Sequence, residues 1–215
     1  MESLTNKPSF CEDDLDAFGE IVNIAMGQAG SLLAEAFSGF VHLQVPNIRT
    51  IKWEELQKIT DNLISKSSTI SAVRQEFMGE FSGFIMVIYG CASYAILREI
   101  LGFDDRESGE VGKRQREELL LELSNSLAST CTMKIASQLK LQCGLKPPRI
   151  VAVEQPSKDV VRTLFGPEPT WSLEQALQID ILFHLDGHDF PFELLITVSP
   201  ESLPLVQKSI ARLLT

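Results

Sequence analysis

The segment from Asp14 to Phe37 carries apolar residues at three- and four-residue steps, which is the spacing of an amphipathic helix. The opposite face of this helix carries polar residues and glycines. The pattern predicts one long helix near the start of the chain. Its apolar positions are Leu15, Phe18, Val22, Ala25, Ala29, Leu32, Leu33 and Ala36.

The rest of the first half predicts strands and short helices. Residues 40–51 predict a strand interrupted by Pro46, which is typical of a sheet edge or of the end of a pairing. Two strands joined near Gly79 are predicted over residues 69–89. Short helices are predicted over residues 53–60 and 91–102, and the polar residues 103–113 predict a linker.

The second half repeats this order of elements. Residues 114–142 predict a long helix, residues 145–154 a strand with two prolines, and residues 157–165 a short helix. Residues 177–198 predict a hairpin that turns at Asp186-Gly187, and the last helix has Pro200 near its start. Two halves with the same order of elements indicate an internal duplication.

A residue pattern sets the register between the two halves. At average residue frequencies, the pattern E-x2-N-x22-P arises at about one starting position in 10,000. It occurs twice here, each time beginning in a predicted helix and ending in a predicted strand. The chain is therefore predicted to be one domain made of two repeats, residues 12–102 and 114–213. The copies, 102 positions apart, are Glu20, Asn23 and Pro46, and then Glu122, Asn125 and Pro148.

The polar residues of the first repeat form a stripe along the predicted helix. At about 100° per residue, Asp16, Glu20 and Asn23 lie within roughly 60° of one another. Gly27 and Gly30 continue the line. Because the apolar residues centre on nearly the opposite face, the stripe is predicted to face outward. The matching residues of the second repeat are Glu118, Glu122, Asn125, Ser129 and Thr132.

Two interpretations of the stripe require no partner. Glu and Asn on a helix usually belong to a solvated face, and glycines also suit close packing of another helix of the same chain. However, each glycine on an exposed helix costs up to about 1 kcal/mol relative to alanine, with no compensating packing in solvent. Together with the duplication, this cost favours a surface that a partner approaches closely at Gly27 and Gly30.

Composition and charge narrow the class of protein. With 215 residues, 44% of them hydrophobic, the chain can bury a sizeable core. The net charge of -10 argues against nucleic-acid binding, which needs clusters of Lys and Arg. The N-terminal residues have no signal-peptide pattern and no apolar run reaches membrane-spanning length, so we expect a cytoplasmic protein that does not bind membranes. The four cysteines form no C-x-x-C pair.

The chemistry available to the stripe is limited. An exposed glutamate is a poor general base, and no histidine lies near the stripe in sequence. A metal site is weakly supported, since His184 and His188 flank a predicted turn, where polar residues are ordinary. An amide can nevertheless hold an attacking water through one donor and one acceptor. That suffices for phosphoryl transfer if a partner supplies the rest of the site, including the metal.

The pattern D/S-x3-E-x2-N-x22-P, duplicated on two long helices, resembles the motif of the CheC/CheX/FliY family of chemotaxis phosphatases. A chain with two copies is most similar to the two-site CheC type, over about residues 12–213. The first copy fits the whole pattern, whereas Glu118 stands in the second where the motif has Asp or Ser. The resemblance implies an α/β fold of the α+β kind, with pseudo-twofold symmetry and two long helices on one side of an antiparallel sheet.

The resemblance also implies an activity. It implies a hydrolase that removes the phosphoryl group from the aspartyl-phosphate of a CheY-like response regulator, in chemotaxis or another two-component pathway. The Mg²⁺ would belong to the regulator, so no cofactor of the chain's own is expected. The deamidase CheD is a further partner implied by the resemblance alone. Carried over by motif position, Asn23 and Asn125 would orient the attacking water, Glu20 and Glu122 would dock the regulator, and Asp16 and Glu118 would support docking at the edge.

A second hypothesis is a non-catalytic module with the same fold, either a receiver-binding adaptor or a scaffold similar to the flagellar switch proteins. It predicts binding without turnover. The intact asparagine in both copies argues against it, because an adaptor has no need of a water-orienting amide. An enzyme with its own small-molecule pocket has less support, since no glycine-rich phosphate loop follows a predicted strand.

Overall fold

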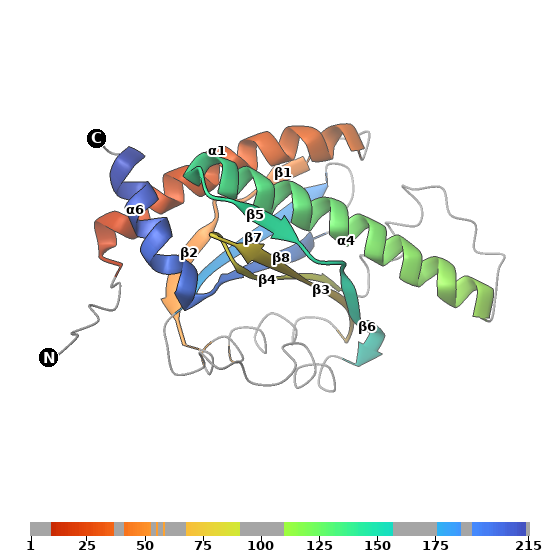
Figure 1. Ribbon diagram of the computed structural model, residues 1–215. Helices are drawn as coiled ribbons and strands as arrows, with labels where there is room; N and C mark the ends of the chain where they lie inside the picture. Colours follow the sequence, from red (N-terminus) through yellow and green to blue (C-terminus); the bar gives the residue numbers. More distant parts are fainter. Residues whose placement is uncertain are drawn as a thin grey trace, which may run out of the picture.

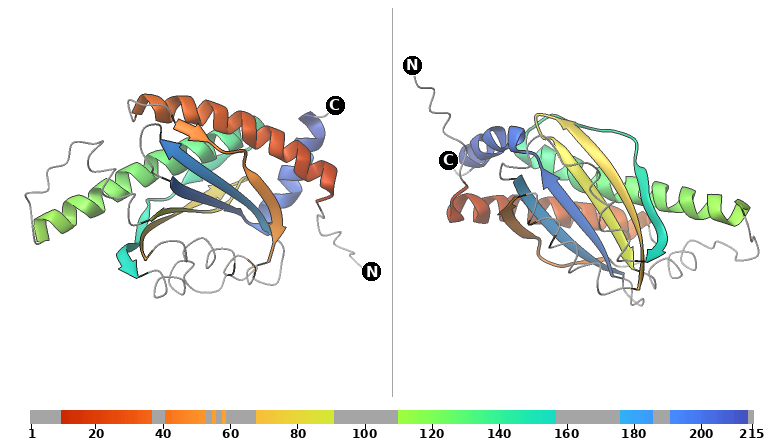
Figure 2. Two further views of the ribbon diagram at one scale, coloured as in Figure 1. Left: turned by 180° about the vertical axis from the view of Figure 1, so that it is seen from behind. Right: turned by 90° about the horizontal axis from the view of Figure 1, so that it is seen from below.

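The computed structural model describes residues 10–36, 41–52, 55, 58, 68–90, 110–156, 176–185 and 191–213. In these ranges one antiparallel sheet carries the helices on one of its faces (Figure 1). The long helices α1 (Glu12–Ala36) and α4 (Glu110–Leu139) lie side by side and run in opposite directions, as Figure 2 shows from two further sides. The predicted α+β fold, with two long helices on one side of an antiparallel sheet, is confirmed.

The strand order of the sheet is symmetric about its centre. In the described ranges the order is β1 and β2, then β7, β8, β4 and β3, then β5 and β6, and every pairing is antiparallel. The outer strands of each half of the chain thus pair with a strand of the other half, which is the arrangement that an internal duplication produces. The bounds are β1 (Val41–Leu43), β2 (Asn47–Ile51), β3 (Thr69–Gly79), β4 (Gly83–Gly90), β5 (Cys143–Leu145), β6 (Arg149–Pro156), β7 (Ala176–Leu185) and β8 (Pro191–Val198).

Helix α1 is the long helix predicted from the apolar spacing between Asp14 and Phe37. Acidic residues in its first turn stabilise it by interacting with the positive end of the helix dipole. The side chains of Phe18, Val22 and Ala25 are fully buried in the core that lies between the helices and the sheet. Burial of a side chain as large as Phe18 contributes roughly 1.5–3 kcal/mol to the stability of the fold.

Helix α4 is longer at its start and shorter at its end than the predicted helix over residues 114–142. Residues 110–113 are helical, so the predicted linker over residues 103–113 is wrong in its last part. At the other end Lys140 adopts a left-handed conformation with φ 56°. The N–H groups of Lys140 and Leu141 donate to the oxygens of Ser137 and Ala136, which is a Schellman motif. This motif ends the helix at Leu139, and a lysine in that conformation is not a signal that a sequence displays.

The prolines interrupt the two outer strands instead of lying within them. The predicted strand over residues 40–51 is divided into β1 and β2 around Pro46, and the predicted strand over 145–154 into β5 and β6 around Pro147 and Pro148. Proline has no N–H for a ladder, so pairing stops at these residues and resumes after them. The predicted edge position of the first of these strands is confirmed.

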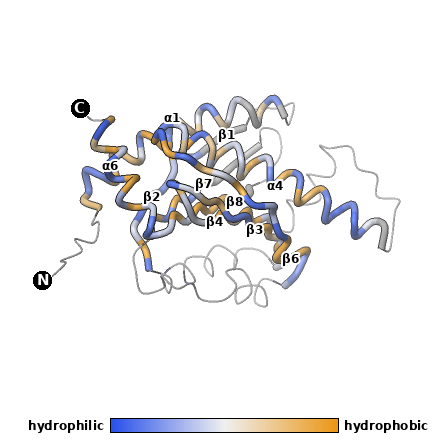
Figure 3. The backbone as a smooth tube through the Cα atoms, viewed as in Figure 1, coloured by the Kyte–Doolittle hydropathy of each residue, from blue (hydrophilic) through white to orange (hydrophobic). Residues whose placement is uncertain are grey.

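The other predicted elements that lie in the described ranges are confirmed. Strands β3 and β4 form the hairpin predicted around Gly79, whose φ of 124° suits glycine, and a Cβ there would lie 2.6 Å from the oxygen of Gln142. Strands β7 and β8 pair as the predicted hairpin. The predicted C-terminal helix is η1 (Pro200–Ser202) followed by α6 (Leu203–Leu213), which contacts α1 and α4 and along which hydrophobic and hydrophilic residues alternate (Figure 3).

Some predictions fall outside the described residues. These are the helices over residues 91–102 and 157–165, most of the helix over 53–60, the linker residues 103–109, and the turn at Asp186-Gly187 with the adjacent His188. Among the helices that the structure describes, none combines the length and the apolar character needed to cross a lipid bilayer.

Candidate functional site

The polar stripe of α1 faces outward over most of its predicted length. Asp16, Glu20, Asn23 and Gly27 are exposed. Gly30 is buried, so its predicted role in contacting a partner is wrong. Residues spaced seven apart drift by about 20° per heptad around a straight helix, and by Gly30 the line has reached the covered side. The exposed stripe therefore ends at Gly27.

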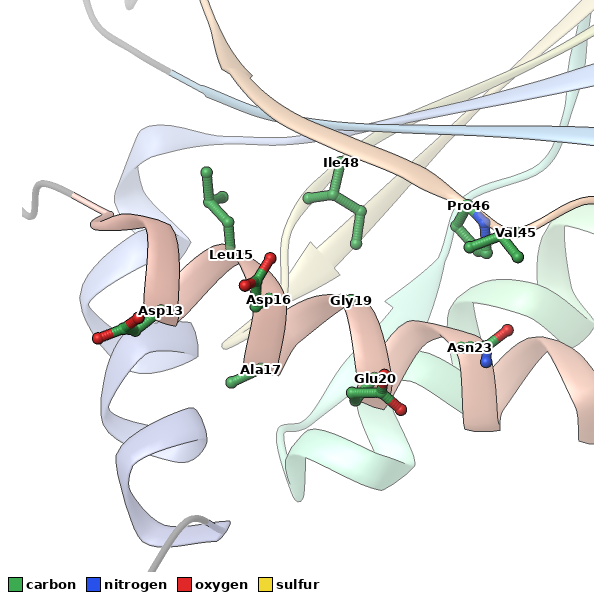
Figure 4. Close-up of a pocket in the computed structure, with 10 residues that line it drawn as sticks. All are labelled: Asp13, Leu15, Asp16, Ala17, Gly19, Glu20, Asn23, Val45, Pro46 and Ile48. Carbon is green, nitrogen blue, oxygen red and sulfur yellow. The ribbon is translucent and has the colours of Figure 1, made fainter.

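A groove of about 650 Å³ runs along the first half of α1 (Figure 4). One wall is α1, and the other is the segment that joins β1 to β2 and the start of β2. Val45 and Pro46 lie over the part of α1 that bears Asn23. The residues that line it are Asp13, Leu15, Asp16, Ala17, Gly19, Glu20, Asn23, Val45, Pro46 and Ile48.

The groove explains the spacing of the first motif. Glu20 and Asn23 are one turn apart on α1, and the 22 residues after Asn23 return the chain to place Pro46 beside it. The proline stops strand pairing at this point, so the backbone at positions 44–46 leaves the sheet next to the helix. The three residues of the motif thus meet on one surface.

The groove is acidic, and none of its ten lining residues is basic. Asp13, Asp16 and Glu20 supply its charge. Asp14 points elsewhere: its carboxylate accepts hydrogen bonds from Gln207 on α6 and from the backbone N–H of Cys11. Slight burial raises the pKa of Asp14, but these hydrogen bonds lower it further, and the net pKa is below the usual value. A negatively charged groove favours a partner that carries a basic group.

The second motif lies on α4 and is also mainly exposed. Glu118, Glu122 and Asn125 are exposed, Ser129 and Pro148 are half-buried, and Thr132 is fully buried. Thr132 matches Gly30, so both helices turn this position toward the protein. The outward surface of the second motif consequently consists of two acids, one amide and one small hydroxyl residue.

The two asparagines differ in how they are held. The side chain of Gln75 on β3 donates from Nε2 to Oδ1 of Asn125 over 2.8 Å and to the backbone oxygen of Lys146 over 2.8 Å. Among the residues that the structure describes, none forms a hydrogen bond with the side chain of Asn23. Sequence reasoning missed Gln75, although a polar residue two positions from Val73 and from Phe77 in a buried strand is itself a signal.

The surroundings of the two asparagines differ as well. Next to Asn23, Ile24 is 53% exposed and Val45 is 81% exposed. The matching residues of the second motif are Ser126 and Pro147. The first surface therefore combines acidic groups with exposed apolar side chains, and sequence reasoning did not single out either of these apolar residues.

No metal site emerges from the described part of the chain, and two of its thiols are shielded by burial. Within the described ranges no group of three or more His, Cys, Asp or Glu side chains is placed to hold a metal ion. His184 lies opposite His42 in the β1–β7 pair, and His188 falls outside those ranges. Burial raises the pKa of Cys131 to about 12 and that of Cys143 to about 11, so both stay as unreactive thiols.

Comparison with known proteins adds to this geometry. No protein-family model matches the chain. It is 24% identical to the CheY-P phosphatase CheC of Bacillus subtilis over 143 residues, an alignment that covers 65% of this chain and 66% of that protein, just under two thirds of its length.

Solved structures share the fold at low sequence identity. FliY of Thermotoga maritima has a TM-score of 0.63 and 17% identity over 95% of this chain and 99% of its own. The chemotaxis protein CheX of Desulfovibrio desulfuricans has a TM-score of 0.52 and 13% identity, over 84% of this chain and 99% of its own. The middle domain of FliM from H. pylori has a TM-score of 0.51 and 10% identity, over 93% of this chain and 99% of its own.

The duplicated motif, the fold that carries it and the sequence similarity to CheC agree with one another. The chain is thus similar to CheC in sequence and to FliY and CheX in fold, which agrees with the resemblance to the CheC/CheX/FliY family that the motif indicates.

Proposed function

We propose that this chain is a protein phosphatase that hydrolyses the aspartyl-phosphate of a CheY-like response regulator, in chemotaxis or a related two-component pathway. The observation that carries the proposal is the groove in which Glu20, Asn23 and Pro46 meet on an exposed, acidic surface. Similarity to CheC of B. subtilis, a CheY-P phosphatase, supports the reaction class.

In the proposed mechanism, Asn23 and Asn125 supply the catalytic amides. Each amide enters the active site of the regulator and holds a water in line with the phosphorus, accepting from it and donating to it. The water attacks phosphorus, the bond to the aspartyl oxygen breaks, and inorganic phosphate and a free carboxylate result. Because this transition state is loose, positioning of the water accounts for much of the effect, and the Mg²⁺ of the regulator offsets the phosphate charge.

Glu20 and Glu122 have the docking role in this proposal. Each glutamate is exposed one turn before its asparagine, where it can pair with a basic group of the regulator. Asp16 and Glu118 lie one further turn away and add to the negative charge of each surface. Gly27 lets the backbone of the regulator approach α1, since among the described residues no heavy atom outside its own stretch of helix lies within 4 Å of a Cβ built at that position.

The test of this proposal is a dephosphorylation assay. The chain is mixed with phosphorylated receiver domains from the same cell and Mg²⁺, and loss of the phosphoryl group is followed over time. We expect acceleration with at least one receiver, and loss of that acceleration in the double variant Asn23→Ala/Asn125→Ala. Acceleration that persists in the double variant, or is absent with every receiver, would refute the proposal.

The same double variant provides a control on the structural interpretation. Both asparagines are exposed, so their truncation should leave the circular dichroism spectrum unchanged and should lower the stability by only about 1 kcal/mol, through loss of the hydrogen bond from Gln75 to Asn125. A double variant that no longer folds would mean that these side chains belong to the core and not to a site.

A scaffold is the second candidate function, and a specific observation favours it. The middle domain of FliM shares this fold over 93% of the chain, so the fold by itself does not require catalysis. A scaffold would bind a receiver, phosphorylated or not, without changing the lifetime of its phosphoryl group. The assay above separates the two functions, because it measures turnover and not binding.

A further inference from the structure

We propose that Gln75 is a positioning residue of the second site, which fixes the orientation of Asn125 and ties it to the segment that precedes Pro148. The consequence for catalysis rests on the phosphatase function proposed above, whereas the positioning itself does not. Gln75 belongs to the first half of the chain and lies outside both motifs.

The geometry joins the two parts of the second motif. Gln75 lies on β3 with its side chain toward α4, and only 3% of it is exposed. Its Nε2 donates to Oδ1 of Asn125 on α4 and to the oxygen of Lys146, each over 2.8 Å. The N–H of Lys146 also donates to the oxygen of Glu76 over 2.9 Å. One amide group therefore links the helix that bears Asn125 to the connection between β5 and β6.

The same contacts define which atoms face each other. A peptide oxygen can only accept, so the Gln75 amide must turn its nitrogen toward Lys146. Since that nitrogen also faces Asn125, the asparagine must present its oxygen there. The Nδ2 group of Asn125 is then directed away from Gln75, and its oxygen keeps a second lone pair for a water. The amide is thus oriented before any partner arrives.

A purely structural role does not explain an amide at this position. Gln75 Oε1 is buried and has no hydrogen-bond partner among the residues that the structure describes, which lowers the stability of the fold. The strand registers also identify the matching residue of the other half. Asn47 lies opposite Asp180, and the residue 102 positions later, Arg149, lies opposite Arg74.

Asp180 thus matches Arg74, and the next residues, Ile181 and Gln75, match each other. Ile181 occupies, beneath α1, the place that Gln75 occupies beneath α4, and Ile181 is fully buried in the core. The fold accepts an apolar side chain of similar size at this point. The amide of Gln75 is therefore not required for folding, and the group that it serves is Asn125.

This difference has a kinetic consequence. A catalytic side chain that is already ordered loses less conformational entropy when the partner docks. Asn125 is held in this way, whereas Ile181 offers Asn23 no hydrogen bond. Removal of the Gln75 amide should therefore slow turnover at the second site, without changing how tightly the regulator docks through Glu122.

The first experiment needs no partner. Side-chain amide ¹⁵N relaxation is measured for Asn23 and Asn125 in the full chain and in Gln75→Leu. We expect a higher heteronuclear NOE for Asn125 than for Asn23 in the wild type, and similar values for the two in the variant. Gln75→Met, unbranched and of similar length, repeats the test if the leucine variant folds poorly. Equal values in the wild type would overturn the proposal.

The second experiment measures turnover one site at a time. In an Asn23→Ala background only the second site acts, and Gln75→Leu should lower kcat about three- to tenfold while the receiver concentration at half-maximal rate stays constant. The matched control is Gln75→Leu in an Asn125→Ala background, where the first site should keep its rate.

The outcomes separate the two proposals. An unchanged kcat in the first background, or an equal loss in both backgrounds, would overturn the positioning role. A wild-type chain that dephosphorylates no receiver would contradict the phosphatase function and the kinetic consequence together. The relaxation experiment decides the orientation of Asn125 in either case.

Discussion

A buried hydrogen bond between Tyr89 and Ser124 anchors α4 to the sheet directly beneath the second motif. Tyr89 lies on β4 and is fully buried, Ser124 precedes Asn125 and is 1% exposed, and their oxygens are 3.0 Å apart. Burial raises the pKa of Tyr89 well above its usual value, although the hydrogen bond to Ser124 lowers it somewhat. Burial thus favours the protonated phenol, which is the form that can donate to Ser124.

The cost of breaking this bond follows from the burial of both groups. Tyr89→Phe keeps the ring and removes only the hydroxyl, so the hydroxyl of Ser124 loses its hydrogen bond to Tyr89. Loss of one partner of a buried hydrogen bond costs about 1–3 kcal/mol, because the other group remains desolvated. Ser124 can turn to the carbonyl oxygen four residues earlier in α4, so we expect about 1 kcal/mol for Tyr89→Phe. Ser124→Ala should cost about 1–2 kcal/mol.

A double-mutant cycle measured by urea unfolding tests this reasoning. Once one hydroxyl is gone, removal of the other no longer breaks the bond between them, so the double variant should be more stable than the sum of the single effects by about 1 kcal/mol. The m-value should not change, because the surface exposed on unfolding is the same. Single effects that add to within about 0.3 kcal/mol would show that the two hydroxyls do not interact, and would refute the anchoring role.

Three further predictions concern docking, the glycine and pH. Glu20→Ala and Glu122→Ala should raise the receiver concentration at half-maximal rate with little change in kcat. This increase should be smaller at high salt, because the Debye length falls from about 10 Å at 0.1 M to about 3 Å at 1 M. Glu201→Ala, which lies outside both motifs, is the control. Gly27→Leu should not destabilise the chain, since no described atom outside the local helix lies within 4 Å of a Cβ built there, yet it should abolish turnover in an Asn125→Ala background. The hydrogen bond from Lys146, opposed by partial burial, lowers the pKa of Glu76 below 4.5. The stability that Glu76 contributes is therefore complete above this value and is lost as pH falls through the lowered pKa, so urea unfolding of Glu76→Gln should show a weaker loss of stability below pH 4.5.

Local patterns predicted the parts of the fold that local forces determine. The apolar spacing located α1 to within two residues at either end, because one face of a surface helix must be buried. The apolar segments on either side of Gly79 predicted β3 and β4, and β4 is buried from Phe84 to Tyr89. The end of α4 was misplaced because Lys140 adopts a left-handed conformation that glycine usually supplies. Pairing across the two halves could not be predicted, since it depends on contacts far apart in sequence.

The site divides in the same way. The outward direction of Asp16, Glu20 and Asn23 follows from helical geometry and could be predicted. That Pro46 lies beside Asn23 could not, because the motif gives a spacing and not a contact. The exposed Val45 became part of the surface only because the proline next to it ends strand pairing.

The strand order explains why the second site depends on Gln75, a residue 50 positions earlier in the chain. Each half supplies a long helix with its motif and a pair of short outer strands, but those strands pair with β3 or β7 of the other half. The strand beneath each motif thus comes from the half that does not carry it. A substitution in β3 consequently alters the surroundings of Asn125, and one in β7 those of Asn23. Two surfaces with similar motifs can therefore diverge through residues that neither motif contains, and Gln75 and Ile181 are the pair in which this divergence is visible.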